Sequence, residues 1–318
     1  MQKNMNAPLS CNDFSLFDLR EGLAEEILET YPDDHFDLVI TSPPYNIGKE
    51  YEREERLSLD DYLEWLDGII EKLVKKLKNT GSICWQVGNY IDAGEVFPLD
   101  IFFYQLFKKR GLKLRNRIIW RFNFGLNATN RFSGRYETLL WFSKSDEYTF
   151  NLDPVRVPQL YPGKRHSDKK GDKAGKPSGN PLGKNPSDYW EFSGEKAFKD
   201  DPVWDIPNVK SLHPEKTIHP CQFPIELAER CILAFSNAGD VVLDPFVGTG
   251  TSVIASLKHG RASVGIDKSP EYVKIATDRV SKFCAGELAM RPSGKPVRRP
   301  KKTEKVAQVP EEWLQTNE

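Results

Sequence analysis

The sequence predicts an α/β protein built on a doubly wound, mostly parallel sheet. Short apolar runs typical of buried strands alternate with segments whose apolar residues recur every three or four positions, as in amphipathic helices. The strands are separated by helix-length crossovers, which is the spacing of parallel strand-helix-strand units. A chain of 318 residues, of which 39% are hydrophobic and 29% charged, is long enough to bury the core of such a sheet.

The first half of the chain supplies strands and helices in turn. The apolar run at 36–41 predicts a short strand. Ser58-Leu59-Asp60-Asp61 resembles a capping box and opens a helix that we expect to end near Gly81. The apolar positions of this helix recur at intervals of three and four: Tyr62, Leu66, Ile69, Leu73 and Leu77. We then expect strands at 82–87, 118–122 and 138–142, with a helix at 99–109 after the first of them.

The second half repeats this alternation. A helix is expected at 224–235, a buried strand at 241–243 and a helix at 251–258 that ends near Gly260. Another strand follows at 262–266, and Ser269-Pro270 caps a last helix that runs through Val280. The repeated order of strand, helix and strand favours a parallel sheet.

A basic segment from Arg156 to Lys184 interrupts the pattern. The chain has a net charge of −1, yet this segment carries eight basic residues against Asp168 and Asp172, a net charge of 8 − 2 = +6. Its glycines and prolines favour a loop, and aromatic residues follow it, a combination typical of a nucleic-acid surface. The alternative is a solvated loop without a partner. The basic residues are Arg156, Lys164, Arg165, Lys169, Lys170, Lys173, Lys176 and Lys184.

Other features exclude several classes of protein. Five cysteines occur without any Cys-x-x-Cys pair, so neither a disulfide framework nor a zinc site is expected. No apolar run has the length of a membrane span, and residues 1–12 lack the apolar core of a signal peptide, so we expect a cytoplasmic protein without a membrane partner. A second basic run at 291–305 contains three prolines and is predicted to be a disordered tail.

The most informative stretch is Ser42-Pro43-Pro44-Tyr45, at the end of the first strand. Two prolines in succession cannot continue a helix or a central strand, because each lacks an N–H group and has a fixed φ. The chain therefore leaves the strand in a stiff turn that presents a hydroxyl, the Pro43 carbonyl and an aromatic ring at the carboxyl edge of the sheet, where α/β folds bind ligands. This set suits a flat base with an amino group, whereas the alternative is a purely structural turn.

A glycine-containing loop, Asp244 to Thr251, follows a later strand and opens a helix. It holds only Gly248 and Gly250 and has no lysine, so a ligand without phosphates fits it better than a nucleotide phosphate. Asp267 ends the next strand, where an acidic side chain can accept hydrogen bonds from ribose hydroxyls. The alternative role for Asp267 is to cap the helix that begins beside Ser269.

Together these motifs resemble the S-adenosyl-L-methionine-dependent DNA amino-methyltransferases of the beta arrangement, over about residues 14–282. The resemblance rests on Thr-Ser-Pro-Pro-Tyr early, His219-Pro220-x-Gln222-x-Pro224 in the middle and Asp-Pro-Phe-x-Gly-x-Gly-Thr late, in that order. It implies a Rossmann-like methyltransferase sheet with circularly ordered motifs and an inserted target-recognition region. The implied divisions are a catalytic half (1–148), a basic recognition insertion (149–214), a cofactor-binding half (215–285) and a basic tail (286–318).

The resemblance also implies roles for single residues. Ser42, Pro43, Pro44 and Tyr45 would be the catalytic residues, acting on a base flipped out of duplex DNA, and Arg135-Tyr136-Glu137 begins a block near that base. Asp18 would lie near the adenine ring of the cofactor and Asp267 on its ribose, while the eight residues of the basic segment would contact DNA. The remaining implied cofactor residues are Pro220, Gln222, Asp244, Phe246, Gly248, Gly250 and Thr251. A homodimer and a companion restriction endonuclease are further implied partners.

The identity of the base stays open between two choices. Serine at the first motif position usually accompanies methylation of the cytosine N4 amino group in this family, whereas Asp or Asn usually accompanies adenine N6. We therefore expect cytosine, with adenine as the alternative and a catalytically inactive DNA-binding module as a further one. Cys221 resembles a nucleophile and His213 with His219 a metal pair, but their spacing favours neither reading, so we expect catalysis without a metal.

Overall fold

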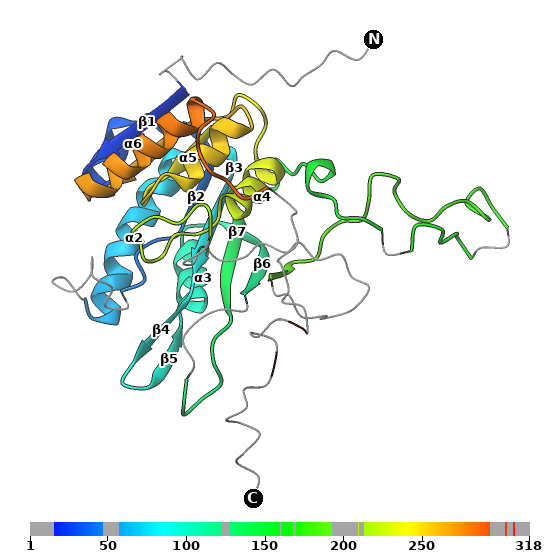
Figure 1. The fold of residues 1–318 in the computed structure, drawn as a ribbon, viewed down its shortest axis with the longest axis horizontal. Coiled ribbons are helices and arrows are strands. Elements are labelled where there is room, and N and C mark those ends of the chain that lie inside the picture. The colour runs from blue at the N-terminus through cyan, green and yellow to red at the C-terminus, as the bar shows by residue number, and fades with distance from the viewer. Residues whose placement is uncertain are drawn as a thin grey trace, which may run out of the picture.

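The computed structural model describes residues 16–46, 57–122, 128–159, 161–167, 170–192, 209, 213–292, 303 and 308. Within these ranges the strands form one eight-stranded sheet in the order β1-β10-β9-β2-β3-β7-β6-β8, beside a small β4–β5 hairpin (Figure 1). The sheet strands are β1 (Phe17–Glu21), β2 (Phe36–Thr41), β3 (Leu77–Val87), β6 (Lys113–Phe122), β7 (Tyr136–Ser143), β8 (Tyr189–Phe192), β9 (Val241–Asp244) and β10 (Ala262–Asp267). The hairpin joins β4 (Asn89–Asp92) to β5 (Glu95–Pro98).

The expected fold class, a doubly wound and mostly parallel sheet, is confirmed. Strands β1, β10, β9, β2 and β3 are parallel, and β7 runs antiparallel to both β3 and β6. Strands β9 and β10 come from the end of the chain, yet they lie between β1 and β2. The loops that follow β2, β9 and β10 therefore meet at one edge of the sheet, although they come from opposite ends of the sequence.

Helices cover both faces of the sheet. The helices are α1 (Ala24–Ile27), α2 (Leu59–Lys76), α3 (Leu99–Lys109), α4 (Ile225–Phe235), α5 (Thr251–Lys258) and α6 (Pro270–Cys284), with short 3-10 turns η2 (Leu28–Thr30) and η4 (Asp153–Val155). Side chains of α2 and α3 pack with Val39 in one core, whereas those of α4 and α5 pack with Leu38 and Ile40 in another. This alternation follows from the two-residue period of β2, which is buried on both faces.

Most expected elements lie within a few residues of their predicted bounds, but the junction of α2 and β3 was misplaced. Ser58 caps α2 as predicted, accepting a hydrogen bond from the Asp61 N–H (3.1 Å). The helix ends at Lys76, and Leu77 already belongs to β3. The first residues of β3 after Leu77 are polar and largely exposed, so they carry no apolar pattern that would separate a strand from a turn.

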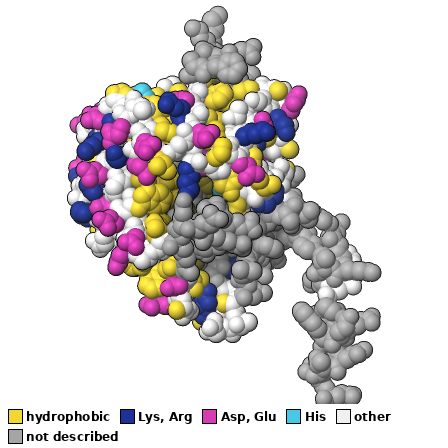
Figure 2. Space-filling model, turned by 90° about the vertical axis from the view of Figure 1, so that its left-hand side faces the viewer, with side chains coloured by type: hydrophobic (Ala, Val, Ile, Leu, Met, Phe, Trp, Pro, Cys, Tyr) yellow, Lys and Arg dark blue, Asp and Glu magenta, His cyan; other side chains and the backbone are white. Residues whose placement is uncertain are grey.

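The basic segment leaves the α/β body as a long excursion, drawn in green in Figure 1. Its two arms are linked by isolated bridges between Val157 and Lys184 and between Arg165 and Pro177. Strand β8 follows the excursion and pairs in parallel with β6, which returns the chain to the edge of the sheet. The face on the left-hand side of the view in Figure 1, away from the excursion, carries acidic and basic side chains intermixed around hydrophobic ones (Figure 2).

The predicted tail begins with ordered packing. Leu288 and Met290 pack against the core on the α4–α5 face, and the Arg291 guanidinium pairs with the Glu226 carboxylate (3.1 Å). Beyond 292, only Thr303 and Gln308 belong to the described residues, so the prediction of disorder there lies outside them. No helix within the described ranges has the length and apolar character needed to cross a membrane.

Candidate active site

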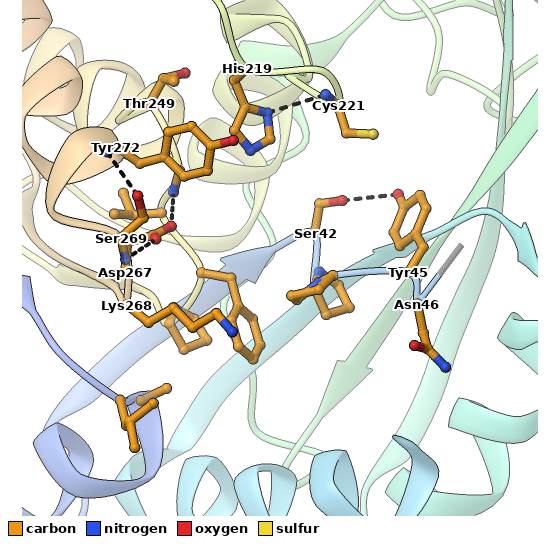
Figure 3. A pocket seen from close by; sticks show the side chains of 18 of the residues that line it. Ser42, Tyr45, Asn46, His219, Cys221, Thr249, Asp267, Lys268, Ser269 and Tyr272 are labelled. Atoms are coloured by element: carbon orange, nitrogen blue, oxygen red, sulfur yellow. Dashed lines mark hydrogen bonds between the residues drawn. The ribbon is translucent and has the colours of Figure 1, made fainter. Parts of the chain in front are cut away.

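A cavity of about 470 Å³ opens at the carboxyl edge of the sheet. It is lined by the turn after β2, the loop after β9, the residues after β10, the segment before α4 and one side of α2. Figure 3 shows Asp267, Ser269 and Tyr272 on one side of it and Ser42 and Tyr45 on the other. The topology thus brings together the two motifs that the sequence places at opposite ends of the chain.

The turn after β2 is held by contacts with α2 and with the residue before its cap. The Tyr62 hydroxyl donates to the Pro44 carbonyl (2.7 Å). Asn46 has φ +55° and exchanges two hydrogen bonds with the Leu57 backbone, donating from Nδ2 (2.7 Å) and accepting at Oδ1 (3.1 Å). Asparagine tolerates this left-handed backbone better than most residues do. These contacts keep Ser42 and Tyr45 at the cavity wall.

Ser42 and Tyr45 are hydrogen bonded to each other across the turn. Their hydroxyl oxygens are 2.9 Å apart, and the Tyr45 hydroxyl also faces Glu137 Oε2 at 3.4 Å. The Gln86 amide donates to the same carboxylate oxygen (2.5 Å). Tyr45 packs against Gly88, where an added Cβ would be 3.2 Å from the Tyr45 ring. A network of polar side chains therefore runs from Ser42 into the neighbouring strands β3 and β7.

The loop after β9 is braced from beneath by Asp244, which is fully buried. Its carboxylate accepts hydrogen bonds from the Thr41 hydroxyl (2.6 Å), the Ser252 hydroxyl (2.6 Å) and the Phe246 N–H (3.1 Å). Burial raises the pKa of Asp244 to about 6. Gly250 has φ +79° and is the N-cap residue that precedes α5, and a Cβ there would approach the Cβ of Ala276 to 3.1 Å. Asp244 and Gly250 shape the loop and do not line the cavity.

Asp267 lies at the cavity wall beside Gly248. Its two carboxylate oxygens accept from the Gly248 N–H (2.9 Å) and the Ser269 N–H (2.9 Å), and burial raises its pKa. The residue that caps α6 is Ser269, whose hydroxyl accepts from the Tyr272 N–H. Asp267 is thus not the cap of α6, and its carboxylate keeps lone pairs for a ligand in the cavity.

His219 lies over the glycine loop. Its Nδ1 accepts from the Cys221 N–H (3.2 Å), its ring packs edge-on against Tyr272 (4.6 Å between centroids), and burial lowers its pKa to about 4. The imidazole is therefore neutral near pH 7, with its proton on Nε2. A Cβ added to Gly248 would lie 3.4 Å from that nitrogen, in van der Waals contact, and the Gly248 φ of +49° is the left-handed backbone conformation that favours glycine.

Other predicted residues have supporting positions. Gln222 lines the cavity, but its amide group clamps its own loop by donating to the Glu215 carbonyl (2.8 Å) and accepting from the Thr217 hydroxyl (2.9 Å). Pro220 does not line the cavity, although residues on both sides of it do. Phe246 and Thr251 line it as expected. Cys221 lines it too, in a position that the sequence spacing alone did not indicate.

Asp18 requires a correction, because the structure does not place it in the cavity. It lies within β1, where its carboxylate accepts from the Tyr31 hydroxyl (2.7 Å) and pairs with Arg20 (3.4 Å). The part of this region that reaches the cavity is Gly22 to Glu25, directly after β1. Asp18 is therefore set back from the cavity, because β1 continues past it before it reaches the carboxyl edge.

Several lining residues were not singled out from the sequence. Trp65 lies on α2, and its ring packs against Phe246 (5.9 Å between centroids). Trp65 lies next to the buried apolar residues of α2 but is not one of them. This offset is the only feature of the sequence that could have marked Trp65 as a cavity residue. Lys268 and Tyr272 follow Asp267 closely enough that their proximity could have been expected.

The basic segment holds side chains of two kinds. Five of the predicted basic residues are exposed: Lys164, Arg165, Lys170, Lys173 and Lys176. Arg156 is committed to internal contacts, pairing with Asp153 (2.6 Å) and donating to the Gly183 carbonyl (3.0 Å), while Lys184 is half-buried. Lys169 lies outside the described residues.

Comparison with known proteins gives one consistent family. The model of the DNA methylase family N6_N4_Mtase matches residues 36–278. The chain is 47% identical over 256 residues to the type II methyltransferase M.BglII of Bacillus subtilis, and the match covers 80% of this chain and 66% of that protein. It is 32% identical over 276 residues to the DNA adenine methyltransferase YhdJ of Escherichia coli K12, covering 85% and 84%.

Solved structures show the same fold. The DNA modification methylase TTHA0409 of Thermus thermophilus, solved with S-adenosyl-L-methionine, aligns with a TM-score of 0.59 and 26% identity over 85% of this chain and 95% of its own. The cytosine-N4-specific PvuII DNA methyltransferase aligns with a TM-score of 0.61 over 86% and 93%, and at 20% identity this likeness concerns the fold alone.

Proposed function

This chain belongs to the DNA methylase family, and we propose that it transfers the methyl group of S-adenosyl-L-methionine to the N4 amino group of cytosine in duplex DNA. The observation that carries this proposal is that Ser42, with its Pro-Pro-Tyr turn, shares one cavity with Gly248 and Asp267. The turn provides hydrogen-bond acceptors for an amino group. The opposite wall of the cavity provides the Asp267 carboxylate and, at Gly248, backbone that a ligand can approach closely.

The residues on the second side suit S-adenosyl-L-methionine, which supplies a methyl group on a positively charged sulfur. The Asp267 carboxylate, held by two backbone N–H groups, can accept hydrogen bonds from ribose hydroxyls. Trp65 and Phe246 provide apolar ring surface in the same cavity. No lysine lies in the loop from Asp244 to Thr251, as suits a ligand without phosphates.

The residues of the turn position the base. An exocyclic amino group is a weak nucleophile, because its lone pair is delocalised into the ring. Ser42 Oγ and the Pro43 carbonyl can each accept one amino hydrogen, which aims the nitrogen lone pair toward the methyl group, while the ring of Tyr45 lies beside the base. The base must be flipped out of the duplex to reach this turn. No covalent enzyme intermediate is required, so the rate acceleration comes from positioning of the base and exclusion of water.

Adenine N6 is the second candidate target. YhdJ is named an adenine methyltransferase and is 32% identical to this chain, and a hydroxyl can accept an amino hydrogen from either base. Serine in place of an acid at position 42 favours cytosine. Single-molecule sequencing of host DNA, with and without the expressed protein, tests the choice and maps the recognition site at once. Modified cytosines support the proposal, whereas modified adenines alone overturn its choice of base.

We also propose the division of labour along the chain. Residues 1–148 and 215–285 form the catalytic and cofactor halves of one domain, 149–214 form the target-recognition insertion and 286–318 the basic tail. Supporting this, the excursion of the basic segment lies between η4 and β8 and presents five exposed cations. A net positive excursion suits the DNA backbone. A homodimer and a companion endonuclease remain part of this proposal as partners.

A further inference from the structure

We propose that Glu137 is a positioning residue that orients the hydroxyl of Ser42 toward accepting a hydrogen bond from the base. The inference rests on the proposed function, and it assigns the polar network behind Ser42 a role in the reaction. Glu137 does not line the cavity. It acts through Tyr45, whose hydroxyl lies between the carboxylate and Ser42.

The direction of each hydrogen bond follows from the chemistry of the groups. The distance between Ser42 Oγ and Tyr45 Oη, 2.9 Å, allows either oxygen to donate. An ionised carboxylate can only accept, so the Tyr45 hydroxyl donates its one proton to Glu137. The Tyr45 oxygen must then accept from Ser42. Once its proton is used in this way, Ser42 Oγ presents only lone pairs to the cavity, which is what an amino hydrogen needs.

The fold holds the carboxylate in place for this task. Strand β7 runs antiparallel to β3 with Thr138 opposite Val87 and Leu139 opposite Gln86, so Glu137 enters at the carboxyl end of β3. The buried Gln86 amide donates to the same oxygen, Oε2, that faces Tyr45. Gln86 thereby fixes the carboxylate orientation, and Gly88 leaves room for the Tyr45 ring beside it.

The contact between Tyr45 and Glu137 is 3.4 Å long in this structure, at the outer limit of a hydrogen bond. Such contacts commonly shorten when the substrate is bound.

The experiment compares Glu137→Leu, Tyr45→Phe and the double variant in the full-length chain. Leucine removes the carboxylate that accepts from Tyr45, so the Tyr45 hydroxyl can donate to Ser42 instead, and the Ser42 proton then turns toward the base. We expect kcat for methyl transfer to a duplex containing the mapped site to fall roughly 10- to 100-fold, with KM for DNA unchanged. Phenylalanine removes the connecting hydroxyl and should cause a loss of similar size.

The double variant distinguishes positioning from mere support of the fold. If Glu137 acts through the Tyr45 hydroxyl, Glu137→Leu adds nothing once that hydroxyl is gone, and the double variant equals Tyr45→Phe. Each variant should still melt cooperatively and should bind S-adenosyl-L-methionine, measured by calorimetry, as tightly as the unsubstituted protein. Asp278→Asn, which changes an exposed acid on α6, is the control for loss of one negative charge and should leave kcat unchanged.

Two results overturn the inference. One is a Glu137→Leu variant with unchanged kcat, and the other is a pair of losses that multiply in the double variant. In both cases the unsubstituted protein still methylates DNA, so the proposed function stands. If the unsubstituted protein transfers no methyl group to DNA, the proposed function fails and this inference fails with it.

Discussion

The two sides of the cavity are held in different ways. On the cofactor side, the loop after β9 is braced within the loop and by the strand and helix that follow it: Asp244 binds Ser252 and Phe246, Asp267 binds Gly248, and the Arg279 guanidinium on α6 donates to the Thr249 carbonyl. Thr41 of β2 adds one contact from the other end of the chain. On the base side, the turn after β2 depends on residues from α2, β3 and β7. Apart from Thr41, the cofactor side is therefore held within one stretch of the chain, whereas the base side is assembled from several separate elements.

This difference determines which side each substitution should affect. A change on the base side should lower turnover and spare cofactor binding, because its contacts are to the amino group. A change on the cofactor side should weaken cofactor binding first. The two sides can therefore be separated by measuring kcat and cofactor affinity in the same variants.

Ser42→Ala tests the base side most strongly. It removes one acceptor for the amino group, and we expect kcat to fall roughly 100-fold, because that hydrogen bond serves the transition state. Cofactor affinity, measured by calorimetry, should stay the same. Turnover equal to that of the unsubstituted protein would remove Ser42 from the mechanism, and a parallel loss of cofactor affinity would break the separation between the two sides.

Asp267→Ala tests the cofactor side. Loss of the carboxylate should weaken binding of S-adenosyl-L-methionine by about 2 kcal/mol, or roughly 30-fold, because hydrogen bonds to a charged acceptor are removed. Calorimetry gives this value directly, with Glu271→Ala as the control, since this exposed acid in the first turn of α6 does not line the cavity. Unchanged cofactor binding in Asp267→Ala would mean that Asp267 does not contact the cofactor and serves only to hold the Gly248 and Ser269 backbone.

The basic segment should influence neither side of the cavity. Replacing Lys164, Lys170 and Lys173 with alanine should weaken DNA binding and lower the slope of log affinity against log salt by up to about 0.9 for each phosphate that the variant no longer binds. Cofactor affinity should not change. The matched control is Lys282→Ala, in the last turn of α6. An unchanged slope in the triple variant would make the segment a solvated loop.

A further effect, on stability and not on either ligand, concerns Asp244, the brace beneath the glycine loop. Burial raises the pKa of Asp244 to about 6 in the folded state, above its ordinary value of 3.8. Its contribution to stability is therefore fully present below pH 3.8 and is lost as the pH rises through about 6. Relative to Asp244→Asn, the unsubstituted protein should lose about 1–3 kcal/mol of unfolding free energy between about pH 4 and pH 7. Equal pH dependence of the two proteins in urea titrations would contradict this.

Much of the fold and the centre of the site could be predicted from the sequence. Ser42 to Tyr45 and Gly248 with Asp267 are short motifs whose residue types are restricted by backbone geometry or by contact with a ligand. The two motifs meet at one edge of the sheet because the strands that lead to them are parallel, and those strands are apolar enough to be predicted. The positions of Asp18 and Asp244 were harder to predict, because a short motif does not show how far its residues lie from the cavity.

The remaining features depend on tertiary contacts that have no local signature. Trp65 lines the cavity because α2 is rotated so that its buried stripe faces the core. The link from Ser42 to Glu137 joins residues far apart in the chain, through a strand order that the sequence pattern does not specify. Strand β1 was missed because only Phe17 and Leu19 in it are apolar, and its place in the sheet comes from pairing with β10.

The most direct test of the central claim is mass spectrometry of nucleosides from DNA treated with the purified protein and deuterium-labelled S-adenosyl-L-methionine. DNA from a host without methyltransferases serves as substrate, and Ser42→Ala as the control. The account predicts labelled 4-methylcytosine that depends on Ser42. Label found only in 6-methyladenine would contradict the choice of cytosine, and DNA without label would contradict the assignment as an active methyltransferase.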